Sequence, residues 1–409
     1  MKMFTGSILR MANGWTREMF HVKHGEKQMQ KNETYSVEIT GLTAEGEGVA
    51  RVDGQVVFVP GVIPGERCKI KIDHVGRTCA YGSLVRVEKT SEHRVTPECE
   101  SFGHCGGCVF WHMDYACELE QKRRRVQDAL SRIGGIDFPD LQITGSESIY
   151  GYRNKVQFPV QVQNGKAVAG FYKAGSHTVI PITDCKIQPG VAKTIRAAVL
   201  SWMEKENVPA YDERTHTGLV RHIYLRYGAK SGQTLVCTVA NCEALPKKKA
   251  LVREILAADA NVTGIVVNYN TKKSNVILGE RFETLYGEGY LEDMLLGLTF
   301  RLSPAAFYQV NHDQAERLYE KAIEFARFTG EETALDLYCG SGTITLCLAR
   351  HVKTVYGVEI VDAAIHDAKE NARKNGIVNA KFFCADAGQA AIQFARDGVK
   401  PDVIVVDPP

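Results

Sequence analysis

The stretch ALDLYCGSGT at residues 334–343 decides the fold of the C-terminal part of this chain. A short apolar run leads into a turn with two glycines, and a helical pattern begins directly after the turn. Three further apolar runs follow at residues 354–358, 380–384 and 402–406. Strands that alternate with helices in this way predict an α/β domain with a parallel, Rossmann-like sheet.

The expected strands end in acidic residues. Glu359 follows the second strand, Asp386 the third and Asp407 the fourth. The carboxyl ends of parallel strands meet at one edge of a sheet, so these carboxylates would face a common ligand, with Glu359 on its ribose hydroxyls. A dinucleotide site would place a glycine where Thr345 stands. Each acid alone is equally a helix cap or a surface residue, but the ordered set favours a positively charged nucleoside such as S-adenosylmethionine (SAM).

A second signature is a group of cysteines, in which Cys99 precedes a C-G-G-C sequence formed by Cys105 and Cys108. Thiols this close, in a chain without an export signal, favour metal ligands over disulfides. Cys185 is the best candidate for a fourth ligand. A single C-x-x-C pair favours an iron–sulfur cluster over structural zinc, which usually shows two such pairs. The intervening glycines are expected to let backbone N–H groups point at sulfur.

The region before these cysteines predicts a different kind of domain. Residues 33–92 show short alternating strands with glycine turns, which predict an OB-like β-barrel. Four cations on or beside its strands would suit single-stranded nucleic acid, and they equally suit a solvated face: Lys69, Lys71, Arg77 and Arg86.

Residues 93–300 are expected to form a central α+β domain. A helix is predicted over residues 114–133, with the cations of residues 122–125 on its exposed side. One strand is predicted to open at residues 151–156 and another to cover residues 219–226. The second strand carries three polar residues that we interpret as surface charges or as part of an RNA track: Arg221, His222 and Arg226.

Composition sets the outer limits. The chain has 409 residues and a formal charge of +2, so only local patches can indicate a nucleic-acid partner. Its 12 cysteines are too few for a disulfide scaffold. No apolar run approaches the ~18 residues of a membrane span, and residues 1–30 lack a signal core. We therefore expect a cytoplasmic protein with no membrane contact, and a disordered or spurious extension at residues 1–32.

Together these motifs resemble the SAM-dependent RNA uracil-C5 methyltransferases, specifically the bacterial iron–sulfur type that acts on 23S rRNA. The resemblance covers residues 33–409 and includes Y-R-N-K at residues 152–155 and S-P-A-A-F-Y-Q-V-N at residues 303–311. It implies a TRAM domain for the barrel and a SAM methyltransferase domain at residues 301–409. It implies a [4Fe-4S] cluster on Cys99, Cys105, Cys108 and Cys185, and SAM contacts from Gln309, Tyr338, Thr343, Glu359, Asp386 and Asp407.

The resemblance also implies a mechanism. A cysteine thiolate adds to C6 of uracil, C5 then attacks the SAM methyl group, and a base removes the C5 proton. The substrate would be a uridine in a loop or single-stranded region of 23S rRNA, flipped out of its context, and the enzyme a monomer.

The catalytic residues of the family follow its D-P-P motif, which in this chain ends at Pro409. The nucleophilic Cys and the Glu base are therefore expected after Pro409. We accordingly expect no catalytic residue in this chain, a truncated methyltransferase domain and no activity.

Two other functions stay open. The D-P-P sequence also begins the signature of amino-methyltransferases that act on adenine or cytosine, although the barrel and the cysteines favour uracil C5. A non-catalytic RNA-binding protein with a vestigial SAM domain is the second alternative, and affinity for SAM would count against it.

Overall fold

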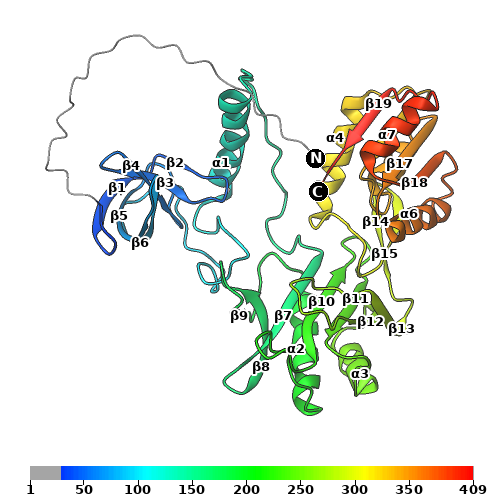
Figure 1. The fold of residues 1–409 in the computed structure, drawn as a ribbon, viewed down its shortest axis with the longest axis horizontal. Coiled ribbons are helices and arrows are strands. Elements are labelled where there is room, and N and C mark those ends of the chain that lie inside the picture. The colour runs from blue at the N-terminus through cyan, green and yellow to red at the C-terminus, as the bar shows by residue number, and fades with distance from the viewer. Residues whose placement is uncertain (1–28, 409) are drawn as a thin grey trace, which may run out of the picture. The chain divides into compact units, whose positions relative to one another are not determined.

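The protein is described by a computed structural model that places residues 29–408. It divides into two compact units, one ending at Arg94 and the other beginning at Val95 (Figure 1). Among residues 29–408, no helix has both the length and the apolar composition that a membrane span requires.

Two predictions concern the ends of the chain. The extension expected at residues 1–32 lies outside the described residues, apart from its last four. Pro409 also lies outside the described residues. The expectation that the nucleophilic Cys and the Glu base follow Pro409 therefore stays a prediction, as does the truncation of the methyltransferase domain.

The first unit is one six-stranded sheet in the order β1-β5-β6-β4-β3-β2. Its strands are β1 (Thr34–Glu38), β2 (Gly41–Leu42), β3 (Gly48–Val52), β4 (Gln55–Val59), β5 (Arg67–Val75) and β6 (Cys79–Lys89). Side chains alternate along β5, so Ile70 and Ile72 are fully buried while Lys69 and Lys71 lie on the opposite face. Met29 is also buried in this core, so the packing of the unit includes a residue before Glu33.

An ion pair with a buried carboxylate joins the last residue of this unit, Arg94, to the segment between β4 and β5. Glu66 is fully buried and accepts hydrogen bonds from Arg94 Nε at 2.6 Å and from the Ile63 backbone N–H at 2.9 Å. Burial opposes ionisation of Glu66, but the bonds from Arg94 and the backbone outweigh it and hold the pKa of the carboxyl below its ordinary value. The residue that ends the unit is therefore anchored inside it.

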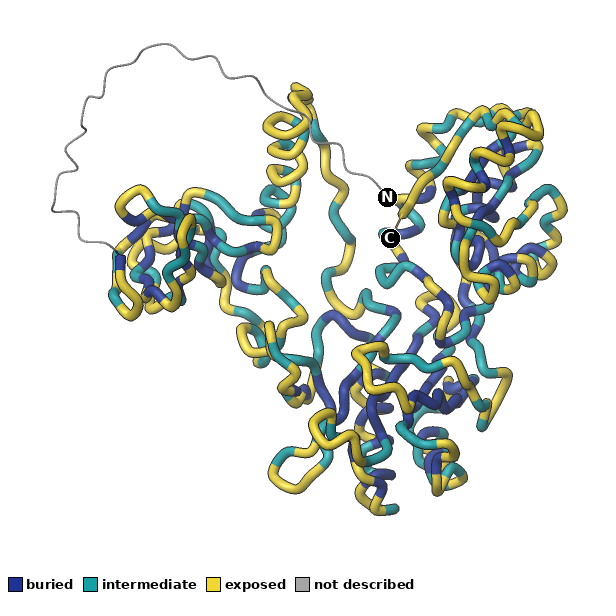
Figure 2. The backbone as a smooth tube through the Cα atoms, viewed as in Figure 1, coloured by how far each residue is buried: buried dark blue, intermediate teal, exposed yellow. Residues whose placement is uncertain are grey.

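The second unit contains a seven-stranded sheet in the order β13-β12-β11-β10-β7-β8-β9. Its strands are β7 (Lys155–Gln163), β8 (Lys166–Tyr172), β9 (Val179–Pro181), β10 (Val220–Tyr227), β11 (Thr234–Ala240), β12 (Val262–Tyr269) and β13 (Arg281–Gly287). Helices α2 (Gly190–Lys205) and α3 (Lys248–Ala258) pack on it around Trp202, which is fully buried (Figure 2).

The other face of this sheet shares a core with the C-terminal part of the chain. Tyr224 and Leu235 of the sheet are buried together with Phe300 and with Leu346. Phe300 belongs to the hairpin of β14 (Leu291–Leu295) and β15 (Leu298–Leu302). Residues 93–300 and 301–409 are therefore joined by one hydrophobic cluster, and the expected boundary between them falls inside β15.

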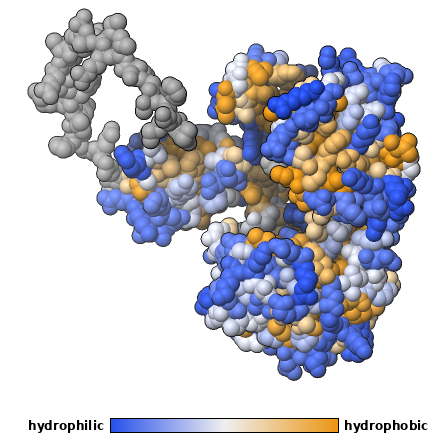
Figure 3. All heavy atoms as spheres, turned by 45° about the vertical axis from the view of Figure 1, so that its right-hand side comes forward, coloured by the Kyte–Doolittle hydropathy of each residue, from blue (hydrophilic) through white to orange (hydrophobic). Residues whose placement is uncertain are grey.

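The C-terminal part holds the expected parallel sheet, in the order β18-β17-β16-β19. Its strands are β16 (Thr333–Leu337), β17 (Thr354–Glu359), β18 (Ala380–Cys384) and β19 (Val403–Val406). Its helices are α4 (His312–Ala326), α5 (Thr343–Ala349), α6 (Asp362–Lys374) and α7 (Ala387–Arg396). The Rossmann-like prediction is confirmed. Apolar residues also reach the surface in patches (Figure 3). Ile404 and Val406 on the edge strand β19 are exposed.

Helix α1 (Tyr115–Asp128) begins as predicted and continues into the π-helical turn η1 (Ala129–Ile133). The Asp114 carboxylate accepts a hydrogen bond from the Cys117 backbone N–H at 2.7 Å, which caps the helix. Within α1, Cys117 is the buried residue, and the rest of the helix is partly or fully exposed (Figure 2). The run of cations is partly neutralised on the helix itself, because three of them pair with Glu118 and Glu120: Lys122, Arg123 and Arg124.

Two predictions for the central strands are wrong. Strand β7 begins at Lys155, because the backbone N–H groups of residues 151, 153 and 154 donate to the carbonyls of Lys186, Ile187 and Val310, which lie outside the neighbouring strands. The interpretation of Arg221, His222 and Arg226 as surface charges or an RNA track also fails. All three are buried, because β10 lies inside the sheet, between β11 and β7, and both faces of the sheet are covered by packed side chains.

Candidate cysteine centre and cofactor site

The four predicted cysteine ligands line a single cavity of about 250 Å³: Cys99, Cys105, Cys108 and Cys185. The loop that carries the first three is attached to the end of β8. Cys105 forms a β-bridge with Lys173, and the Gly106 N–H donates to the Tyr172 carbonyl at 3.0 Å. A Cβ on Gly106 would lie 3.1 Å from the backbone of Ala174, so this close approach favours glycine.

The environment of three of these cysteines, Cys105, Cys108 and Cys185, disfavours ionisation of their thiols. Burial raises the pKa of Cys105 and Cys108, and it raises the pKa of Cys185 to about 11. The Gly107 N–H donates to Cys105 Sγ at 3.3 Å, as the glycine pair predicted, and this bond acts in the opposite direction. At neutral pH the thiols need a nearby positive charge, such as a metal centre, to become thiolates.

The spacing of the sulfurs bears on what could bind between them. Among the described residues, no three of these sulfurs lie within 4.8 Å of one another. One tetrahedral zinc, with bonds of about 2.3 Å, would draw its four sulfurs to about 3.8 Å from one another. An all-thiol donor set that is spread around a cavity fits a polynuclear centre better than a single ion.

The second candidate site lies at the carboxyl ends of the parallel strands. Strand β16 lies between β17 and β19, so the direction of the chain connections changes here, as at ligand sites of open α/β sheets. Tyr338 follows β16 with a left-handed φ of 69°, and its side chain is exposed. The Gly340 N–H donates to one Glu359 oxygen at 3.2 Å, and the Val361 N–H donates to the other at 2.9 Å. Glu359 is thereby held against the glycine turn.

The structure brings further predicted residues to the same edge. Gln309 Nε2 donates to Asp407 Oδ2 at 3.4 Å, which joins two residues far apart in the sequence. Thr343 is the first residue of α5 and is buried, with its hydroxyl 3.3 Å from that of Tyr319. Asp386 lies beyond β18 and caps α7, because its side chain accepts from the Gln389 N–H at 3.0 Å. Its alternative role as a helix cap is therefore realised.

Two residues that position this site were missed by sequence reasoning. Buried Tyr224 and Arg226 of β10 reach the segment that carries Gln309. The Tyr224 hydroxyl donates to the Pro304 carbonyl at 2.7 Å, and the Arg226 guanidinium donates to the Ala306 carbonyl. The sequence of β10, with cations among apolar residues, does not distinguish this buried role from a surface role, although a buried cation requires hydrogen-bond partners.

A third missed residue, Asn154, lies between the two sites. Its side-chain amide donates to the Gln309 carbonyl at 2.8 Å, and its backbone N–H donates to the Val310 carbonyl at 2.9 Å. One residue earlier, the Arg153 N–H donates to the Ile187 carbonyl at 2.9 Å, close to Cys185. The Y-R-N-K segment therefore connects the Cys185 loop to the Gln309 segment.

Asp336 is a buried acid beneath the glycine turn. The Thr345 hydroxyl donates to its Oδ2 at 2.5 Å, whereas its Oδ1 has no hydrogen-bond partner in the described part of the chain. Burial raises the pKa of Asp336 to about 7. Thr345, which breaks the dinucleotide pattern, thus serves as a partner for this acid.

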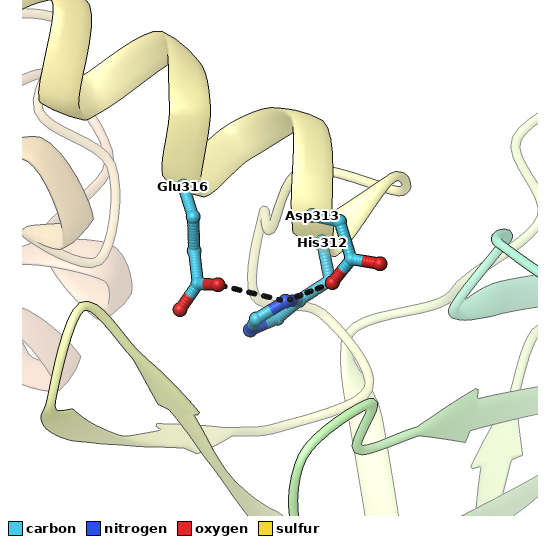
Figure 4. A group of neighbouring side chains, drawn as sticks. All are labelled: His312, Asp313 and Glu316. Carbon is cyan, nitrogen blue, oxygen red and sulfur yellow. Dashed lines mark hydrogen bonds and ion pairs between the residues drawn. The ribbon is translucent and has the colours of Figure 1, made fainter. Parts of the chain in front are cut away.

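A group of possible metal ligands at the start of α4 has a structural explanation: His312, Asp313 and Glu316 (Figure 4). The ring of His312 is buried, and its Nε2 lies 2.6 Å from the Met294 carbonyl, with Nδ1 facing the two carboxylates. Lys230 Nζ lies 3.3 Å from Glu316 and 3.6 Å from Asp313. The Lys230 ammonium group therefore already balances the charge of the two carboxylates. The bond from His312 to Met294 of β14 anchors α4 to the β14–β15 hairpin.

The fold and the strand-end site define a methyltransferase-type α/β domain preceded by a small β-rich domain. Comparison with known families agrees, because residues 28–85 match the TRAM domain and residues 329–407 match a methyltransferase domain. An uncharacterised RNA methyltransferase of Clostridium tetani is 40% identical over 93% of this chain and 83% of its own length. One of Halalkalibacterium halodurans is 42% identical over the same shares. The chain therefore belongs to this family of RNA methyltransferases.

A solved structure shares the fold across both units. The tRNA (uracil-54, C5)-methyltransferase of Pyrococcus abyssi, in complex with S-adenosyl-L-homocysteine, has a TM-score of 0.73 and 24% identity. The match covers 91% of this chain and 83% of that one. At this identity it supports the arrangement of the elements and nothing finer.

Proposed function

We propose that this RNA methyltransferase transfers the methyl group of SAM to C5 of a uridine in 23S rRNA. The observation that carries the proposal is the strand-end site, where Gln309 meets Asp407 and Glu359 is fixed against the glycine turn. The choice of uracil C5 rests on the resemblance of residues 152–155 and 303–311 to the uracil-C5 methyltransferases. The choice of 23S rRNA rests on the resemblance to the iron–sulfur type. The enzyme would act in the cytoplasm as a monomer.

In this proposal SAM lies across the ends of β16 and β17. The Glu359 carboxylate holds the ribose hydroxyls, and Asp386 lies toward the adenine. Tyr338 and Thr343 line the turn between them, and Gln309 and Asp407 face the reacting end. The positive charge of the sulfonium suits this collection of carboxylates.

The four cysteines would hold a [4Fe-4S] cluster. Their all-thiol composition, their spread around one cavity and the backbone N–H directed at Cys105 support this assignment. The cluster supplies a rigid connection between the loop of residues 99–108 and the loop of Cys185, and no redox step is assigned to it. Structural zinc is the alternative that elemental analysis separates.

The attacking thiol of the proposed mechanism is expected after Pro409, outside the described residues. Burial raises the pKa of Cys339 and raises that of Cys347 to about 12, which makes both poor nucleophiles. Cys384 is exposed on the edge strand β18, where its thiol donates to the Ile360 carbonyl at 3.5 Å. We assign none of the three to catalysis, and we expect residues 1–409 alone to bind cofactor without transferring a methyl group.

Deleting the gene in its source organism tests the proposal. We expect 23S rRNA from the deletion strain to lose 5-methyluridine in nucleoside mass spectrometry, and the intact gene to restore it. A copy with Glu359→Ala should fail to restore it. Unchanged 5-methyluridine in 23S rRNA would contradict the proposal. Loss from tRNA, or loss of a methylated adenine or cytosine, would replace it with one of the alternatives.

A further inference from the structure

A second cavity, of about 430 Å³, adjoins the cysteine cavity. The two share Gly107, Cys108 and Ile187 as lining residues. The second cavity also reaches Asn311 and Gln314 at the start of α4. It therefore extends from the cysteine centre to the helix that directly follows the Gln309 segment, and the proposed function assigns no role to it.

Several aromatic rings line this second cavity. Trp111, Tyr115 and Tyr152 all line it, and none of the three is fully buried. The ring of Tyr150 packs against Trp111 with centroids 5.6 Å apart. The Tyr115 hydroxyl accepts from the Ser146 N–H at 2.6 Å. These contacts hold the rings in place before any ligand binds, which lowers the entropic cost of binding.

Polar groups surround these rings. Ser146, Lys122 and Gln314 line the cavity, and Gln314 Nε2 donates to the Gly145 carbonyl at 3.0 Å. Trp111 also hydrogen-bonds Cys108, so the wall of the cavity is tied to one of the predicted cluster ligands. Flat apolar faces with hydrogen-bonding groups at their edges match a nucleobase, whose faces stack and whose edges are polar.

We propose that this cavity binds one unpaired base of the RNA, next to the nucleotide that is methylated, by stacking it on Trp111. The inference rests on the proposed function for the identity of the neighbouring nucleotide. Membership of an RNA methyltransferase family provides the ligand class. The link to the methylation site is short, because Asn311 lies two residues beyond Gln309 and pairs with Arg153 in a β-bridge.

A thermodynamic cycle between one side chain and one base tests this proposal. The probe is a short single-stranded RNA of adenosines with one central uridine, in which each flanking base is removed in turn to leave an abasic site. With the unaltered protein, we expect one abasic position to weaken binding about 5- to 100-fold, as loss of a stacked base does. In the Trp111→Ala variant, the same abasic site should not weaken RNA binding any further. In the Trp111→Phe variant, it should again weaken binding by most of the factor seen with the unaltered protein.

Controls separate stacking from damage to the fold. Tyr286→Ala removes an exposed ring from β13 that lines neither cavity, and it should leave the abasic pattern unchanged. Each variant should keep its affinity for S-adenosylhomocysteine and its visible absorbance. If Trp111→Ala loses that absorbance, Tyr115→Leu replaces it, because Tyr115 lines only the second cavity of the two.

The proposal is overturned if the abasic penalties are the same in the unaltered protein and in both wall variants. This outcome is independent of the proposed function, which the deletion strain tests. Loss of a different methylated base from that strain, together with a coupled Trp111 cycle, would retain the base-binding cavity and reject the proposed reaction. Loss of 5-methyluridine together with an uncoupled Trp111 cycle would retain the proposed reaction and reject the base-binding cavity.

Discussion

The two candidate sites of this chain are built in opposite ways. The cysteine site is a cavity lined by two loops, residues 99–108 and 182–188, and by residues of β7 and β8. Burial raises the pKa of three of its thiols: Cys105, Cys108 and Cys185. The cofactor site is an open row at the ends of parallel strands, where Glu359 and Asp407 remain accessible. The first site depends on long-range folding and a bound centre, whereas most residues of the second follow the strands of one local sheet and only the Gln309 segment is supplied from a distance.

Removing a cysteine ligand should have the largest effect on one site, through loss of bound iron, while cofactor binding at the other site is kept. Cys185→Ser should abolish bound iron and the absorbance shoulder near about 400 nm, because a four-thiolate site loses its closure. Binding of S-adenosylhomocysteine should persist, measured by calorimetry. Cys242→Ser is the matched control, since Cys242 is also partly buried but lies outside the cavity. Full iron content in Cys185→Ser would remove Cys185 from the site.

The buried acid under the open site should give the next largest effect, on stability against pH. The pKa of Asp336 is raised from 3.8 to about 7, so the folded state retains a proton that the unfolded state releases. Stability should therefore fall as pH rises from about 4 to about 7 and level off above that. The difference between these two pKa values corresponds to a loss of stability of about 4 kcal/mol at most. Asp336→Asn should flatten this slope in urea titrations, and an unchanged slope would refute the assignment.

Glu359→Ala probes the open site directly. We expect affinity for S-adenosylhomocysteine to fall about 100-fold, because two charge-assisted hydrogen bonds to the ribose are lost. Glu331→Ala provides a control on the same domain, since that carboxylate is exposed and lies 3.7 Å from Lys353. Equal affinities of the two variants would remove Glu359 from the cofactor site.

Arg226→Met tests whether the central sheet positions the open site from behind. Loss of the guanidinium leaves the Ala306 carbonyl without this donor and should loosen the Gln309 segment. We expect affinity for S-adenosylhomocysteine to fall about 10-fold, with iron content unchanged. Arg253→Met, an exposed position on α3, should have no effect on either. Faster hydrogen exchange confined to residues 303–311 of Arg226→Met would separate positioning from general damage.

Sequence reasoning succeeded where the determinants are local. The strands of the parallel sheet, the cap at Asp114 and the glycine turn follow from short-range patterns, and the structure confirms them. The four cysteines line one cavity, and their role as ligands of a metal centre stays a prediction.

The failures share a physical cause, which is bonding between segments far apart in the sequence. Arg221 was interpreted as a surface or RNA-contacting cation, yet its guanidinium donates to the carbonyls of Asn270, Lys272 and Ser274. No local pattern reveals that a distant loop will satisfy a buried cation. In the same way, residues 151–154 have strand-like composition but bond to the Cys185 loop and to Val310.

Native mass spectrometry of the anaerobically purified protein, with S-adenosylhomocysteine added, tests the two-site account most directly. The account predicts one mass increment for a [4Fe-4S] cluster and a second, independent increment for one S-adenosylhomocysteine. A single zinc ion without inorganic sulfide would contradict the assignment of a [4Fe-4S] cluster to the cysteine site. Absence of the S-adenosylhomocysteine increment would contradict the assignment of the open site.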